Sequence, residues 1–133
     1  MKERYMDKKR VFISFDYDHD VAIKELLVGH AKNEASAFSI SDWSIKEESV
    51  TWKAEAAERI KRSDVVIVLC GENTDCARGV GIELELTQQL DRPYFLLAGY
   101  SDKTCRRPIT AKATDKMYRW TWTNLKLLLE GNR

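Results

Sequence analysis

Two short segments of the sequence carry carboxylates in settings where they could do chemistry. The first is the loop Asp16–Asp20, which follows the short β-prone run Val11–Phe15. The second is Val80–Leu86, in which Glu83 and Glu85 alternate with apolar residues. A carboxylate held in an apolar setting can act as a general acid or base, or it can stabilise a developing positive charge. What decides between these acids is which side chain points inward.

A helical wheel separates the two glutamates. The segment must cross over between two buried strands, which favours a helix although its apolar residues alternate. At about 100° per residue, Glu83 falls among the apolar positions and Glu85 points to the other side. A carboxylate on the apolar side loses hydration unless it has partners, so Glu83 is the candidate catalytic residue. The alternative is that Glu83 contacts backbone amides or an arginine at the helix start.

The elements that would position these acids alternate between strand and helix. The expected strands are Val11–Phe15, Ala37–Ile40, Val65–Cys70, Tyr94–Ala98 and Met117–Trp122. The expected helices are Asp18–Glu34, Trp52–Arg62, Ala77–Leu90 and a closing helix with Thr123 as its N-cap and Leu125, Leu128 and Leu129 on its apolar side. Strict alternation predicts an α/β fold with three layers, a flavodoxin-like five-stranded parallel sheet of order 2-1-3-4-5 with helices on both faces.

Two of these helices show which side they would bury. The inward side of the first helix is expected to carry Val21, Leu26, Val28 and Ala31. In the second, Trp52, Ala56 and Ile60 recur every fourth position, as on one face of a helix.

In such a sheet, ligands bind where the strand order reverses, beyond the carboxyl ends of strands one and three. This places a site at the loops Asp16–Asp20 and Gly71–Thr74. Asp42 and Trp43 would lie nearby, at the start of a polar loop that spans residues 41–51.

Aromatic and acidic side chains at this edge suggest how a ligand would be held. Phe15, Tyr17 and Trp43 could stack on a heterocyclic ring, and ordinary packing is the alternative for each. The acidic residues of the loop, Asp16, Asp18 and Asp20, would repel phosphate, so we expect them to contact hydroxyl groups of a ligand or to cap the following helix.

Composition limits the partners and the compartment. The 133 residues suit a single domain spanning residues 1–133. The 22 basic and 21 acidic residues give no overall field for binding nucleic acid or a membrane. A charged N-terminus and the lack of a long apolar run predict a cytoplasmic protein. The three cysteines and two histidines have no metal-site spacing, so neither a metal site nor a disulfide framework is expected.

Three segments resemble one family. Lys9–Tyr17 looks like the opening strand and loop of Toll/interleukin receptor (TIR) domains, most closely those of the small TIR-like proteins of Thoeris anti-phage systems. Ile60–Leu69 is similar to the central strand of that family, and Val80–Leu84 to its helix with the catalytic glutamate. The resemblance covers roughly residues 9–100. One position departs, because the family commonly has a tryptophan where this chain has Gly79.

The resemblance implies an enzyme that takes NAD as its substrate and needs no cofactor. Enzymatic TIR domains cleave the bond between nicotinamide and ribose, and they yield ADP-ribose, a cyclised form or a conjugate that serves as a signal. The chain would then be an NAD glycohydrolase or ADP-ribosyl cyclase of anti-phage defence. Glu83 would stabilise the ribosyl oxocarbenium ion. TIR domains also assemble with one another, so self-association is a further expectation.

Two other functions fit the same residues. A non-catalytic TIR-like interaction or nucleotide-sensing module is favoured by Gly79, which weakens the helix start. A nucleoside deoxyribosyltransferase-like enzyme also uses a glutamate on this kind of scaffold, but it takes a nucleoside. A receiver domain is disfavoured because strand three ends without an acceptor aspartate, and a flavodoxin because no Ser/Thr/Gly-rich phosphate loop follows strand one.

Overall fold

The computed structural model describes residues 8–33, 36, 38–46 and 50–133. Strands and helices alternate along these residues. The strands are β1 (Lys9–Ser14), β2 (Phe38–Trp43), β3 (Val65–Cys70), β4 (Tyr94–Ala98) and β5 (Met117–Arg119). The helices are α1 (Val21–Ala31), α2 (Trp52–Lys61), α3 (Arg78–Gln89) and α4 (Trp122–Leu129), and a short 3-10 helix, η2 (Thr74–Cys76), precedes α3.

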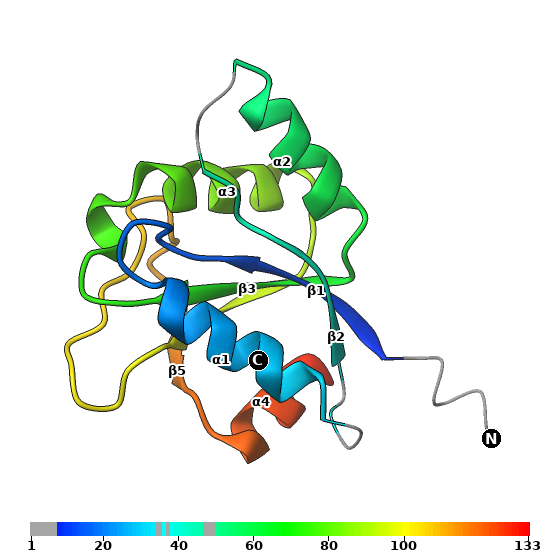
Figure 1. Cartoon of the computed structure of the whole chain (residues 1–133), viewed down its shortest axis with the longest axis vertical. Coiled ribbons are helices and arrows are strands. Elements are labelled where there is room, and N and C mark those ends of the chain that lie inside the picture. Colours follow the sequence, from blue (N-terminus) through cyan, green and yellow to red (C-terminus); the bar gives the residue numbers. More distant parts are fainter. Residues whose placement is uncertain (1–7, 34–35, 37, 47–49) are drawn as a thin grey trace.

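The strands form one parallel sheet of order β2-β1-β3-β4-β5. Figure 1 shows α2 and α3 on one face of this sheet and α1 and α4 on the other. The order reverses between β1 and β3, which pair through Val11 with Val65 and Ser14 with Val68. The predicted three-layer α/β fold and strand order are confirmed.

The central strand β3 is buried along its whole length. Val65, Ile67 and Leu69 pack into the core under α1 and α4. Val66, Val68 and Cys70 pack into the core under α2 and α3. Successive side chains of a strand point to opposite faces, so a continuous apolar run supplies both layers at once.

Strand β2 differs from the prediction. The expected strand Ala37–Ile40 begins outside the described residues, and the observed β2 continues to Trp43. Asp42 and Trp43 were expected in a loop, but they pair with Phe12 and Ile13 of β1 after a bulge. β2 is an edge strand, so its outward side chains stay in water and polar residues are tolerated there.

Helix α1 buries the expected side only in part, because Val28 and Ala31 pack against the core as predicted and the other two expected residues do not. Val21 and Leu26 are exposed, whereas Ile23, Lys24 and Leu27 are buried. Lys24 can be buried because its ammonium lies 2.6 Å from Glu25 Oε2 and 4.5 Å from the centre of the Trp43 ring. A lysine with such partners can occupy an inward position on a helix. The periodicity of apolar residues does not predict that position.

The closing elements also begin and end elsewhere than expected. β5 ends at Arg119 rather than at Trp122. The N-cap of α4 is Thr121, not Thr123, and its hydroxyl accepts a hydrogen bond from the Asn124 amide at 3.0 Å. Leu125, Leu128 and Leu129 are buried as predicted.

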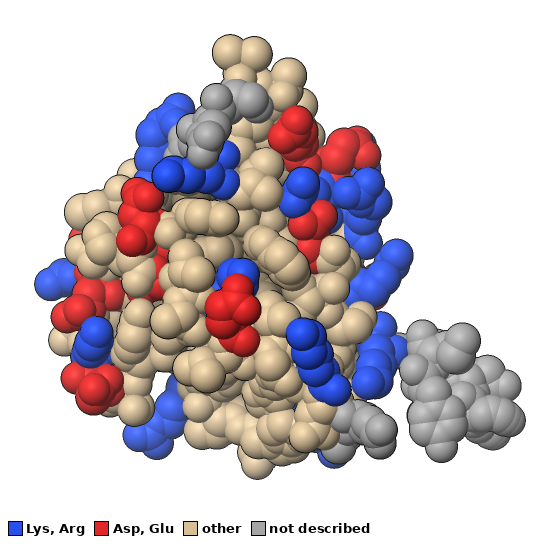
Figure 2. All heavy atoms as spheres, in the orientation of Figure 1, with Lys and Arg blue, Asp and Glu red and all other residues tan. Residues whose placement is uncertain are grey.

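Charges of both signs lie side by side on the face shown in Figure 2. No helix within the described part of the chain is both long enough and apolar enough to cross a membrane.

Candidate active site

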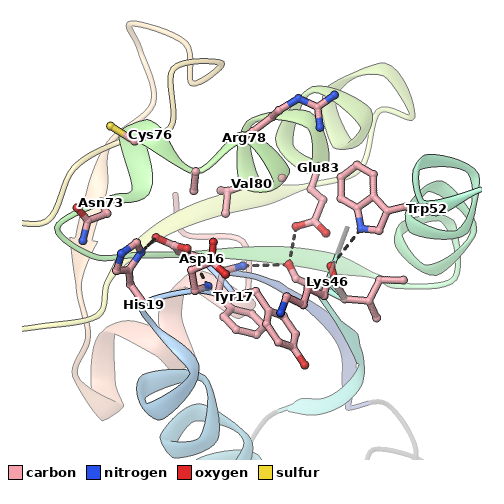
Figure 3. A pocket seen from close by; sticks show the side chains of 16 residues that line it. Asp16, Tyr17, His19, Lys46, Trp52, Asn73, Cys76, Arg78, Val80 and Glu83 are labelled. Carbon is pink, nitrogen blue, oxygen red and sulfur yellow. Dashed lines mark hydrogen bonds and ion pairs between the residues drawn. The ribbon is translucent and has the colours of Figure 1, made fainter. Parts of the chain in front are cut away.

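A cavity of about 380 Å³ opens at the carboxyl edge of the sheet, where the strand order reverses. Its walls come from the loop after β1, the segment after β2 and the region from η2 to the first turns of α3 (Figure 3). The lining residues are Phe15, Asp16, Tyr17, Asp18, His19, Ser44, Ile45, Lys46, Trp52, Asn73, Cys76, Ala77, Arg78, Gly79, Val80 and Glu83. The site thus lies where the fold predicts a ligand.

Glu83 lies in the wall of this cavity and is 1% exposed. Its Oε1 accepts a hydrogen bond of 2.6 Å from the Ser14 hydroxyl and one of 2.5 Å from the Ser44 hydroxyl. Glu85, two residues on, is exposed. The helical wheel therefore predicted the inward direction of Glu83 correctly.

Ser44 reaches Glu83 because β1 and β2 stay paired just beyond the end of β2. The Ser44 amide donates to the Ile13 carbonyl at 2.9 Å, which fixes the backbone at this point. The Ser44 hydroxyl also accepts a bond of 3.1 Å from the Phe15 amide. Ser14 is the last residue of β1 and Ser44 directly follows β2, so the ends of two neighbouring strands bring one hydroxyl each to the carboxylate.

The start of α3 is regular despite Gly79. The helix begins at Arg78, and the Gly81 amide donates to the Ala77 carbonyl at 3.1 Å. Thr110, from a later segment of the chain, stabilises this turn, because its hydroxyl donates a hydrogen bond to the Gly81 carbonyl at 2.8 Å. A glycine at position 79 therefore does not delay the helix that carries Glu83.

Three of the five residues expected to bind the ligand line the cavity with Glu83. They are Phe15, Asp16 and Tyr17. The Phe15 and Tyr17 rings stack with centroids 5.4 Å apart and planes 27° apart. Phe15 is itself buried, so it packs and lines the cavity at once.

Asp42 and Trp43 lie outside the described lining of the cavity. The Asp42 carboxylate instead contacts Arg59 at 2.6 Å and Arg62 at 3.9 Å. Trp43 lies against Lys24. Both residues belong to the paired strand β2 rather than to the loop after it, so the structure does not bring them to the site as expected.

One family matches this arrangement. Its description is "Thoeris protein ThsB, TIR-like domain", and it matches residues 12–103, which include every residue that lines the cavity. The chain belongs to this family. The TIR-like domain of Thoeris is a domain of anti-phage defence. A search among curated proteins gave no match.

Several residues of the TIR-like domain's cavity were not among the sequence candidates. Ser14 and Ser44 contact Glu83 through strand register, for which a single sequence gives no signal. Lys46 and Arg78 supply cations to the cavity wall. Both follow the carboxyl ends of strands in the sequence, and this position could have identified them as candidates. Trp52 was assigned to the core; it is buried, its ring nitrogen donates to the Ile45 carbonyl at 3.1 Å, and it also lines the cavity.

The acidic loop folds back on itself. Asp16 is 6% exposed, and its Oδ1 accepts a bond of 3.1 Å from the Asp18 amide. Its Oδ2 lies 2.7 Å from His19 Nδ1. This hydrogen bond to Asp16 raises the pKa of His19 above its usual 6.5, and the charge of Asp16 adds to the effect.

Asp20 occupies the N-cap position of α1 without the expected capping bond. It is 2% exposed, and its Oδ1 accepts from the Tyr100 hydroxyl at 2.8 Å. Its Oδ2 has no hydrogen-bond partner among the described residues, and it packs against Gly71, where an added Cβ would come within 2.5 Å of it. Burial raises the pKa of Asp20 from 3.8, although the Tyr100 hydrogen bond opposes the shift.

Asp20→Asn should change how stability depends on pH. A carboxyl whose pKa is raised by folding binds its proton more tightly in the native state, so stability falls as pH rises from about 3.8 through the raised value. Asparagine stays neutral, so the variant should gain stability relative to the wild type as pH rises through that window. Urea unfolding across a pH series measures this difference.

Asp18→Asn is the matched control, because it removes one exposed carboxyl from the same loop. A difference between Asp20→Asn and the wild type that stayed constant from pH 3 to pH 8 would contradict the assignment of this pH dependence to Asp20.

Proposed function

We propose that this TIR-like domain cleaves the bond between nicotinamide and ribose in NAD, with Glu83 as the catalytic residue, and that the ADP-ribose product, linear or cyclised, serves as a signal in anti-phage defence. The observation that carries the proposal is a buried carboxylate in the wall of a cavity at the switch point of the sheet, held by two serine hydroxyls. Buried carboxylates with placed donors are common at functional sites.

One carboxylate is enough for this reaction. The nicotinamide ring of NAD is already cationic, so it leaves as a neutral molecule with the electron pair of the broken bond and needs no proton. The ribose carbon becomes part of an oxocarbenium ion, whose positive charge Glu83 stabilises. Ordinary glycosidases need a second carboxyl to protonate their leaving group, and this reaction does not.

The other walls of the cavity suit the remaining parts of the dinucleotide. The stacked pair Phe15 and Tyr17 offers a face for an aromatic ring. Lys46 and Arg78 are the lysine and the arginine among the described lining residues. We assign them to the pyrophosphate, because cations bind phosphate oxygens through charge-assisted hydrogen bonds.

Replacing both cations should weaken the binding of NAD more than the chemistry. For Lys46→Gln combined with Arg78→Gln, we expect the KM for NAD to rise about tenfold, because hydrogen bonds to charged groups are lost. The KM for nicotinamide riboside, which has no pyrophosphate, should change little. Steady-state kinetics with both substrates test this, and Lys53→Gln, an exposed lysine of α2, is the control. Equal effects on the two substrates would contradict the assignment.

The proposed function is tested by incubating the purified chain with NAD and measuring nicotinamide by chromatography. The assay is run over a range of protein concentrations, with and without extract of phage-infected cells, because assembly or infection could be required for turnover. Nicotinamide release that depends on Glu83 supports the proposal. No release under any of these conditions would overturn it and favour the interaction module. Release of bases from nucleosides, but not of nicotinamide from NAD, would favour a deoxyribosyltransferase.

A further inference from the structure

The pair formed by Asp16 and His19 lies in the same cavity as Glu83 and is separate from the hydrogen bonds that Ser14 and Ser44 donate to it. Asp16 is buried and is fixed by the Asp18 amide, so it presents Oδ2 to His19 Nδ1 in one orientation. The His19 side chain is 55% exposed and lines the cavity. Figure 3 shows His19 and Glu83 toward opposite ends of the cavity, with Asp16 beside His19.

The hydrogen bond to Asp16 decides which nitrogen of the histidine is available. A carboxylate accepts a hydrogen bond from Nδ1–H, so the neutral ring carries its hydrogen on Nδ1 and its lone pair on Nε2. An imidazole oriented in this way by a buried carboxylate is the usual arrangement of a general base.

The proposed reaction has a step that needs a base. After nicotinamide leaves, a hydroxyl that attacks the ribose carbon must lose its proton, whether it belongs to water, to a ribose or to another alcohol. Oε1 of Glu83 is already bound to the hydroxyls of Ser14 and Ser44. A nitrogen nucleophile such as a pyridine needs no deprotonation, so only oxygen nucleophiles require the base.

We propose that His19, oriented by Asp16, is the general base that activates a hydroxyl nucleophile, so that the product is linked through oxygen. This inference rests on the proposed function. The oxygen lone pair forms the new bond to the ribose carbon, the electrons of the O–H bond stay on that oxygen, and the proton moves to Nε2 and then to solvent. The broken bond's electrons leave with nicotinamide, so the step needs no oxidant or reductant.

The charges around the ring suit this role. The pKa of His19 is raised from 6.5, chiefly by the hydrogen bond to Asp16 and its charge, and Asp18 and Asp20 add to the effect. General bases work best when their pKa lies near the working pH. The imidazolium that forms after proton transfer is stabilised by the same carboxylates.

The test lets oxygen and nitrogen nucleophiles compete for the same ribosyl cation. NAD is supplied together with 3-acetylpyridine and methanol. 3-Acetylpyridine attacks through nitrogen and forms an exchanged dinucleotide. Methanol attacks through oxygen and forms a methyl glycoside, and water and the hydroxyls of the substrate form the other oxygen-linked products. Chromatography gives the ratio of oxygen-linked products to exchanged dinucleotide. For His19→Gln we expect this ratio to fall about 10²-fold.

Two further variants sharpen the test. Asp16→Asn should lower the same ratio, because an amide can donate to Nδ1 and move the ring hydrogen to Nε2, and the double variant should lose no more than His19→Gln alone. His30→Gln is the matched control, since His30 stacks on Trp122 at 4.2 Å and lines a different cavity. Its ratio should equal that of the wild type.

The possible failures are distinct. If the wild type forms both products and His19→Gln leaves their ratio unchanged, the base assignment is overturned and the proposed function stands. An equal loss of both products would likewise assign His19 to binding and not to proton transfer. If the wild type forms neither product under any condition, the proposed function fails and this inference fails with it.

Discussion

Glu83→Gln will lower the rate of nicotinamide release from NAD by at least about 10²-fold, whereas Glu85→Gln will leave it within about twofold. Glutamine has nearly the same shape and keeps an oxygen that can accept from Ser14 and Ser44, so the cavity wall is preserved. It carries no negative charge, so the stabilisation of the ribosyl cation is lost. Because that charge matters in the transition state and little in the ground state, kcat should fall far more than KM changes.

Glu85 offers a matched control on the same helix. It is exposed, so Glu85→Gln changes net charge and helix composition in the same way without touching the cavity. Initial rates of nicotinamide release, with thermal unfolding to show that both variants are folded, make the comparison. Equal rates for Glu83→Gln and the wild type would remove Glu83 from its proposed role. Equal losses in both variants would point to the charge or stability of α3.

Removing the two hydroxyls that hold Glu83 should give the second largest loss. We expect Ser14→Ala combined with Ser44→Ala to lower kcat about 10²-fold, because a carboxylate displaced by about 1 Å no longer faces the cation correctly. Each hydroxyl lies within 2.6 Å of the same oxygen, Oε1, so each single variant should lose less than the pair. KM should change less than kcat, because the Ser44 hydroxyl, although it lines the cavity, is already bound to Glu83 and to the Phe15 amide.

The two serines should differ in their effect on stability. The Ser44 hydroxyl also accepts from the buried Phe15 amide at 3.1 Å, so Ser44→Ala leaves that donor unpaired at a cost of about 1–3 kcal/mol. Ser63→Ala is the control, because its buried hydroxyl donates to the Ile60 carbonyl at 2.7 Å, beyond the opposite end of β3. Urea unfolding and kcat measured together separate the roles. A kcat lowered as much by Ser63→Ala would show that lost stability, not the position of Glu83, is responsible.

Local patterns of the sequence were enough to predict the alternating strands and helices of the fold. The run Val65–Cys70 predicted the central strand because a parallel strand covered on both faces must be apolar throughout. The inward direction of Glu83 followed from the period of a helix, and its place at the switch point from the order of the strands. The strand and the helix depend on residues close together in the chain, whose periodicity is visible in one sequence, and the strand order is the common one for strict alternation of five strands with helices.

The contacts across the sheet were decided only by the tertiary structure. The bulge between Val11 and Phe12 sets the register that carries Asp42 into β2 and away from the cavity. The burial of Lys24 against Trp43 likewise depends on a strand that lies beside α1 only after folding. Ser14 and Ser44 are separated from Glu83 by 69 and 39 residues in the chain, yet their hydroxyls meet at one carboxylate oxygen. Contacts of this kind are fixed by strand register and by packing between distant segments. The sequence of each segment alone does not encode them.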